Sequence, residues 1–256
     1  MEHTPSAPAA ERSWRRENLT PGMILLLVTA LAWGYTFRAG SMRAVPMPSM
    51  PGMEGAGTSH GPGSLTPFLV GWSIMMVAMM LPSALPLVLM YRGTAGVERT
   101  AARMGALLGG YVLVWTLAGL PVYLYNQLVA TGAPMTAVLP GLLLVGGGAY
   151  QFSWLKKSCH RRCSSPLFYL AREWRPGLVG AIRLGVLHGV DCLGCCVGLM
   201  LGLVGLGMMS PVWMLTGAVV ISAEKTLPEG HRVARPLGVA LVAAGVLVVA
   251  ESLLGR

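Results

Sequence analysis

The amino-acid sequence predicts an all-α protein, a polytopic bundle of transmembrane helices, from its composition and from the length of its apolar stretches. Hydrophobic residues make up 54% of the chain and charged residues only 11%, whereas soluble proteins carry about 25% charged residues. A helix needs roughly 20 apolar residues to cross a bilayer. We therefore expect about seven membrane helices, in the stretches 21–37, 65–91, 104–129, 134–152, 178–206, 209–223 and 236–254.

The distribution of basic residues predicts the orientation of these helices. The chain has 19 Lys and Arg residues against 10 Asp and Glu, a net charge of +9. Most of the basic residues lie in the N-terminal tail and in alternate connections between the apolar stretches. Cytoplasmic connections of membrane proteins carry such an excess. We therefore expect a multi-pass protein of the inner (plasma) membrane, with its N-terminus in the cytoplasm and its C-terminus outside. Membrane topology accounts for the basic composition, so the expected partner is the lipid bilayer and no nucleic-acid partner is expected.

Four regions follow one another along the chain. Residues 1–20 are polar and are expected to form a disordered cytoplasmic tail, and residues 21–37 an N-terminal membrane anchor helix. Cleavage after this helix would leave six membrane helices, although the basic region before it is long for a removable signal. Residues 38–64 are predicted to form an external loop rich in Met, Pro and Gly, and residues 65–256 the helical membrane domain that carries the Cys motifs.

Methionines recur at regular spacing in the external loop and in the apolar stretch that follows it. The loop contains Met47, Met50 and Met53, and the stretch contains Met75, Met76, Met79 and Met80. A spacing of three aligns thioethers along one edge of a polyproline-like segment, and a spacing of four stacks them on one side of a helix. Core packing is an equally good explanation for the helical methionines, whereas a Pro-rich loop has no core to fill.

The first of two cysteine groups lies in the large cytoplasmic connection. Cys159 and Cys163 are separated by three residues, adjoin His160 and stand among several cations. Cytoplasmic thiols stay reduced, and neighbouring cations favour the thiolate. We expect a metal-binding or redox role for this pair, with burial of two small residues as the alternative.

The second cysteine group lies inside the fifth apolar stretch and is the most informative motif of the chain. It comprises His188, Asp191, Cys192, Cys195 and Cys196. At about 100° per residue these five side chains occupy one arc of roughly 140° on a helix. Such a face is not suited to lipid and should point into the protein. In the same stretch, Gly185 and Gly189 are four residues apart, a spacing that lets helices approach closely.

Together these donors favour copper. Soft thioether and thiolate ligands select Cu(I), with zinc and iron–sulfur clusters as competitors for thiolates. Because uncharged thioethers are poor ligands for zinc, the methionines favour Cu(I) as the bound ion, and zinc is the alternative. The expected order of donors is the Met loop, the Met-bearing helix, the Cys/His/Asp centre and finally Cys159 with Cys163. Asp191 is the one acidic residue expected deep in a span, while Glu224 and Lys225 are expected at the cytoplasmic end of theirs.

Several motifs of this chain occur together in a known family. They are Trp72 to Ser83, Gly110-Tyr111 to Trp115, Tyr150-Gln151, Lys156, Cys159-x3-Cys163, Gly185-x-x-His188-Gly189, Cys192-Leu193-Gly194-Cys195-Cys196, Leu199-Met200 and Trp213-Met214 to Glu224-Lys225. With them the sequence resembles a bacterial family of predicted metal-binding integral membrane proteins, a domain of unknown function whose members are sometimes called copper chaperones. The resemblance covers about residues 65–230 and implies metal binding. Ser164 and Val197 depart from the expected Arg and Trp, and leave the candidate ligands intact.

Two functions from different classes fit these observations. The first is a non-enzymatic copper-handling membrane protein, a Cu(I) transporter or a chaperone that exchanges the ion with a periplasmic or cytoplasmic metal carrier or metalloprotein. The second is a membrane thiol–disulfide oxidoreductase that relays electrons between the two Cys groups. Two points count against the oxidoreductase function. Thiol–disulfide exchange requires thiol pairs that meet, and an oxidoreductase would give the Met loop no role. A haem protein is a third and weaker fit, because no Cys-x-x-Cys-His motif is present.

Overall fold

The computed structural model describes residues 7–44, 64–94, 100–207, 211–226 and 230–254. The helices are α1 (Ala7–Ala44), α2 (Leu65–Thr94), α3 (Thr100–Ala130), the 3-10 helix η1 (Pro134–Val138), α4 (Leu139–Tyr150), α5 (Trp154–Cys163), α6 (Pro166–Arg172), α7 (Gly177–Gly205), α8 (Pro211–Thr226) and α9 (Gly230–Leu254). No strand occurs in these ranges, so the all-α prediction is confirmed.

Five of the described helices are long and apolar enough to cross a membrane. A sixth crossing results if η1 with α4 and the following α5 form one broken span, although the two parts are bent by 69°. The stretch 209–223, expected as a further crossing, corresponds to α8, which has only 16 residues. At 1.5 Å per residue this helix is about 24 Å long, which is less than the roughly 30 Å of a bilayer core.

Helix α1 extends beyond the expected anchor helix at both ends. It begins at Ala7, within the segment expected to be a disordered tail, and it continues to Ala44, within the expected external loop. The N-terminal extension is rich in Ala, Glu and Arg, which are strong helix formers. Met47, Met50 and Met53 lie outside the described residues.

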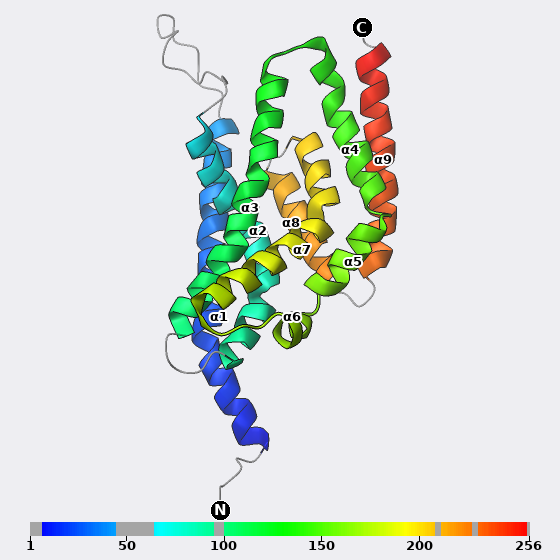
Figure 1. The fold of residues 1–256 in the computed structure, drawn as a ribbon. Helices are drawn as coiled ribbons and strands as arrows, with labels where there is room; N and C mark the ends of the chain where they lie inside the picture. The colour runs from blue at the N-terminus through cyan, green and yellow to red at the C-terminus, as the bar shows by residue number, and fades with distance from the viewer. Residues whose placement is uncertain (1–6, 45–63, 95–99, 208–210, 227–229, 255–256) are drawn as a thin grey trace, which may run out of the picture.

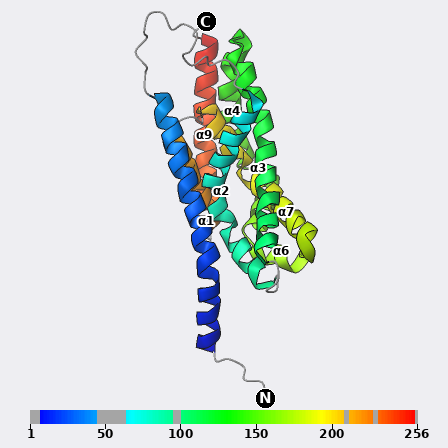
Figure 2. The same ribbon diagram turned by 90° about the vertical axis from the view of Figure 1, so that its left-hand side faces the viewer.

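Helix α7 forms the centre of the bundle and packs against α3, α4, α5 and α8 (Figure 1). Buried residues make up 61% of its most apolar window, against 11% for α1, which lies at the outside of the bundle in both views (Figures 1 and 2). Glycines let the backbones of α3 and α7 touch: a Cβ at Gly185 would lie 2.0 Å from the Leu107 carbonyl oxygen, and one at Gly110 would lie 2.4 Å from that of Ile182. The close approach predicted from Gly185 is therefore confirmed.

A sharp break between α4 and α5 directs the chain across the bundle. Ser153 adopts an extended conformation and its hydroxyl accepts a hydrogen bond from the Lys156 amide at 3.1 Å, which caps a new helix. The new helix, α5, packs against α7. The break therefore brings a segment that is expected in the cytoplasmic connection back onto the central helix.

The connections that carry the basic residues lie toward one end of the molecule. In Figure 1 the end of α2, the start of α3, α6 and the start of α7 lie in the lower part of the bundle, and α5, the end of α8 and the start of α9 lie above them, near mid-height. The end of α3, the start of α4 and the end of α9 lie at the top. The lower end is the one that the charge distribution predicts to face the cytoplasm.

Candidate functional site

The two cysteine groups form a single buried cluster. Helix α5 contributes Cys159 and Cys163, and α7 contributes Cys192, Cys195 and Cys196; each is at most 9% exposed, and all five are free thiols. The Sγ atoms of Cys195 and Cys196 are 3.4 Å apart. The thiol of Cys163 interacts with those of Cys192 and Cys195. The sequence placed the Cys159/Cys163 pair at the far end of a series of donors, whereas the structure joins it to the other three.

The arc predicted on α7 faces the interior. Cys192, Cys195, Cys196 and His188 are each no more than 2% exposed, because the four share the side of α7 that meets α3, α5 and α8. Asp191 lies at the edge of this arc, where its side chain is 13% exposed. The face is therefore continuous, with four residues in the core and one at its margin.

The Cys192 thiol contacts polar side chains from two other helices, α3 and α8. Lys225 of α8 donates a hydrogen bond to its Sγ at 2.8 Å and a second one to the Ser83 hydroxyl at 3.0 Å. The Tyr111 hydroxyl lies 3.2 Å from the same sulfur and 3.2 Å from the Met80 carbonyl oxygen. An ammonium group in contact with a sulfur stabilises the thiolate over the thiol. Cys192 is thus placed for metal binding or for nucleophilic chemistry.

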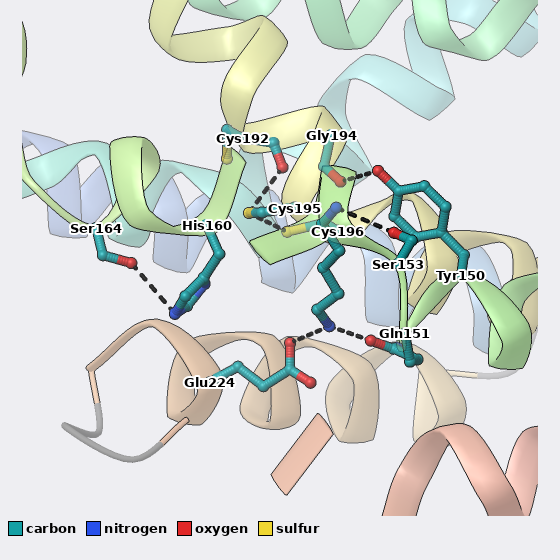
Figure 3. A network of polar contacts seen from close by, with 11 residues as sticks. Tyr150, Gln151, Ser153, His160, Ser164, Cys192, Gly194, Cys195, Cys196 and Glu224 are labelled. Carbon is teal, nitrogen blue, oxygen red and sulfur yellow. Dashed lines mark hydrogen bonds and ion pairs between the residues drawn. The ribbon is translucent and has the colours of Figure 1, made fainter. Parts of the chain in front are cut away.

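Gly194 makes room for the thiol of Cys159. A Cβ at Gly194 would lie 2.7 Å from the Cys159 Sγ, so no larger residue fits there without movement. The carbonyl of Gly194 accepts a hydrogen bond from the Tyr150 hydroxyl at 2.7 Å, which fixes this turn of α7 beside the end of α4 (Figure 3). The glycine inside the Cys-Leu-Gly-Cys-Cys motif is therefore a packing requirement of the cluster.

Asp191 is already engaged by groups at the margin of the cluster. The Tyr169 hydroxyl donates a hydrogen bond to its carboxylate, and a guanidinium nitrogen of Arg162 lies 3.7 Å from it. Burial and the hydrogen bond to Asp191 raise the pKa of the Tyr169 phenol well above its usual value. These contacts link α7 to α5 and α6 through Asp191, which stays a predicted ligand at the margin of the cluster.

His188 is held between two aromatic rings and keeps both nitrogens unused. Its ring stacks on Tyr111 with centroids 5.7 Å apart and meets Tyr169 edge-on at 5.1 Å. Within the described part of the chain, neither ring nitrogen has a hydrogen-bond partner. A buried polar group without a partner is costly, so His188 is suited to accept a ligand that is not part of the chain.

The methionines of α2 lie in the same core as the cysteines. Met76, Met79 and Met80 are at most 2% exposed and belong to one hydrophobic cluster with all five cysteines, while Met75 is partly buried against it. Thioethers in this place fill the core and at the same time provide soft donors. Both alternatives considered for the sequence pattern are therefore compatible with their positions.

A second polar network lies next to the thiols and was not recognised in the sequence. Lys156 of α5 donates hydrogen bonds to Gln151 and, at 2.8 Å, to Glu224 of α8 (Figure 3). The Lys156 and Glu224 side chains are each 6% exposed. Glu224 was expected at the cytoplasmic end of a span and Asp191 as the deeply placed acid, whereas Glu224 is the more buried of the two. Charged residues at the end of an apolar stretch resemble interfacial residues, so nothing in the sequence indicated that Glu224 and Lys225 lie beside the thiols.

The arrangement defines what the site can do chemically. Among the described residues, no three His, Cys, Asp or Glu side chains already enclose a metal position. The Cys195 thiol is hydrogen-bonded to the Cys192 carbonyl oxygen and to the Cys196 thiol. Binding of a soft cation would replace these hydrogen bonds and release the thiol protons. Five thiols, three buried thioethers and an unpartnered imidazole form a donor set that suits Cu(I) better than any hard ion.

Comparison with known proteins adds one finding. A family model described as "PpoB2: Copper chaperone" matches residues 69–248, which contain every motif of the resemblance that the structure places in the core. No curated protein and no solved structure matches the chain. The match confirms the resemblance noted in the sequence.

Proposed function

Because the chain belongs to the PpoB2 family, described as copper chaperones, we propose that it is a membrane-embedded copper-handling protein that carries Cu(I) on its buried sulfur atoms. Copper is its cargo, exchanged with a periplasmic or cytoplasmic metal carrier or metalloprotein. The five candidate spans and the low content of charged residues support a location in the inner membrane. The basic end of the bundle would face the cytoplasm.

The observation that carries the proposal is the convergence of five buried cysteines from α5 and α7 around Cys192 and its partner Lys225. Two thiolates and one Cu(I) form a complex with a net charge of −1. The ammonium of Lys225 supplies a charge of +1 at 2.8 Å from Cys192. Because a buried charge is tolerated only when it is paired, this neutral combination supports a bis-thiolate Cu(I) site at the cluster.

The remaining donors support transfer of the ion rather than permanent storage. Met76, Met79 and Met80 adjoin the thiols in the same core, and His188 has two unused nitrogens. Neutral thioethers and imidazole bind Cu(I) without proton release, whereas thiols must lose protons. A sequence of such donors would allow the ion to pass from one to the next with small changes in charge.

The proposal is tested by Cu(I) loading of the purified chain in detergent under anaerobic conditions. We expect tightly bound copper in the wild type and its loss in a variant with Cys192, Cys195 and Cys196 replaced by Ser. A Cys159→Ser/Cys163→Ser variant should also lose affinity, because the structure joins the two groups. Zinc loading of the same samples serves as the comparison, and a preference for zinc over Cu(I) would contradict the assignment of the cargo.

A thiol–disulfide oxidoreductase is the second candidate, and the contact of Cys163 with Cys192 and Cys195 favours it. Thiols that meet can form a disulfide and pass its electrons on. This function predicts that the wild type, treated with a mild oxidant, forms a disulfide between α5 and α7 that a dithiol reduces rapidly. Absence of bound copper together with such a disulfide would replace the copper proposal by this one.

A further inference from the structure

A cavity of about 560 Å³ lies beside the thiol cluster on the side of the Lys156–Glu224 pair. It is lined by Gln151, Phe152, Lys156, Lys157, His160, Glu224, Ala234 and Arg235. Its volume is within the range of about 300–1,000 Å³ that is typical of pockets for small organic ligands. A bare metal ion would leave most of this space unfilled, so the cavity differs in kind from the sulfur cluster.

Two polar atoms of the cavity wall lack partners. Oε1 of Glu224 and Nε2 of Gln151 form no hydrogen bond within the described residues, although the two residues are only 4% and 3% exposed. Figure 3 shows both side chains on the same side of the cysteines. Buried polar atoms are normally satisfied. Both residues line the cavity and are more than nine-tenths buried, so a ligand bound there would lie next to one unsatisfied acceptor and one unsatisfied donor.

The charges of the wall complete the pattern. Lys156 and Glu224 neutralise each other at 2.8 Å. Lys157 and Arg235 form no ion pair among the described residues, so they leave an excess of two positive charges at the cavity. A complementary ligand carries two anionic groups for these cations and an amino group that donates to Glu224.

We propose that this cavity is a binding site for a small ligand with one amino group and two anionic groups, the chemistry of an acidic or γ-glutamyl peptide and of a serine-type lipid headgroup. The anionic groups face Lys157 and Arg235, the amino group donates to Oε1 of Glu224, and Nε2 of Gln151 donates to a ligand oxygen. The site is separate from the thiols and does not depend on the copper proposal. It lies within one turn of Cys159 along α5, since Lys156 and His160 flank that residue.

The experiment measures binding to the purified full chain in detergent by calorimetry. The probes are S-methylglutathione, which has the required charges but no free thiol, and glycerophosphoserine, which is the headgroup without its acyl chains. The variants are Lys157→Gln, Arg235→Gln and Glu224→Gln, with Arg161→Gln as the matched control on the exposed side of α5. The melting temperature of each variant is recorded alongside, so that loss of fold is recognised.

We expect at least one probe to bind at a single site, and the Lys157 and Arg235 substitutions each to weaken it about tenfold, as loss of a charge-assisted hydrogen bond does. The control substitution should leave binding unchanged. Preference for S-methylglutathione would identify a soluble peptide ligand, and preference for glycerophosphoserine a lipid headgroup. Failure of both probes to bind, or binding that is insensitive to Lys157 and Arg235, would overturn the proposal.

Discussion

Replacement of Lys225 by Met tests the most specific contact of the thiol cluster. The change keeps an unbranched side chain and removes the ammonium group that lies 2.8 Å from the Cys192 Sγ. We expect weaker binding of Cu(I), because the negative charge of a bis-thiolate complex would lose the cation that contacts it. The Ser83 hydroxyl would lose the same donor.

The contact distance sets the expected magnitude. Two unit charges 2.8 Å apart interact by about 6 kcal/mol at an effective dielectric constant of about 20. This value is an upper bound, because burial of the ammonium group opposes it. A hydrogen bond to a charged group contributes about 1.5–3 kcal/mol net. The affinity for Cu(I) should therefore fall by about 10- to 100-fold.

The assay is an anaerobic competition for Cu(I) between the protein and a chromogenic chelator, with the wild type, Lys225→Met and Arg161→Met side by side. Arg161 is an exposed cation of α5, so its replacement controls for the loss of net charge. Circular dichroism establishes that each variant keeps its helices. An unchanged affinity in a folded Lys225→Met variant, or an equal loss in Arg161→Met, would refute the pairing of Lys225 with the bound complex.

Three further predictions concern the frame around the cluster. Gly185→Ala, whose methyl group would meet the Leu107 carbonyl oxygen at 2.0 Å, should destabilise the bundle by about 2–3 kcal/mol. Gly109→Ala is the control, because a Cβ there has open space and should cost little. Thermal unfolding in detergent compares the stability of the two variants. Lys156→Met should cost about 3–5 kcal/mol by leaving Glu224 unpaired, and the double variant Lys156→Met/Glu224→Leu should recover most of this loss in denaturant unfolding. Burial and the hydrogen bond to Asp191 raise the pKa of Tyr169, so its phenol should stay protonated near pH 10, where ordinary tyrosines ionise. In an ultraviolet titration, the wild type and Tyr169→Phe should therefore show the same phenolate absorbance up to about pH 11.

The sequence predicts the helices and the inward face of α7 well, because both depend on local periodicity. Apolar stretches of sufficient length specify membrane helices, and a spacing of 100° per residue places Cys192, Cys195 and Cys196 on one side. The same local argument fails at both ends of α1. The helix extends there into two segments that were expected to be irregular. The segment before the anchor helix was expected to be irregular because it is polar, and the segment after it because it is rich in Pro and Gly.

The composition of the cluster could not be predicted, because it depends on contacts between distant segments. Cys163 meets Cys192 only because Ser153 caps a new helix after a 69° bend. Lys225 reaches the same sulfur from α8, more than thirty residues further along the chain. Charged residues inside a membrane span commonly have a partner and a function. The charged residues at the end of an apolar stretch can therefore point to a site when the helix that carries them packs inside the bundle.

The backbone contact between α3 and α7 limits how a cargo could move through this protein. With Gly110 against the Ile182 carbonyl and Gly185 against the Leu107 carbonyl, the two helices cannot slide or rotate past each other without a clash of main-chain atoms. Carriers that work by alternating access rock one half of the fold against the other, and here the tightest seam of the bundle runs beside the cargo site. Under the proposed function, we therefore expect copper to be handed between side chains by rotamer changes within a fixed scaffold.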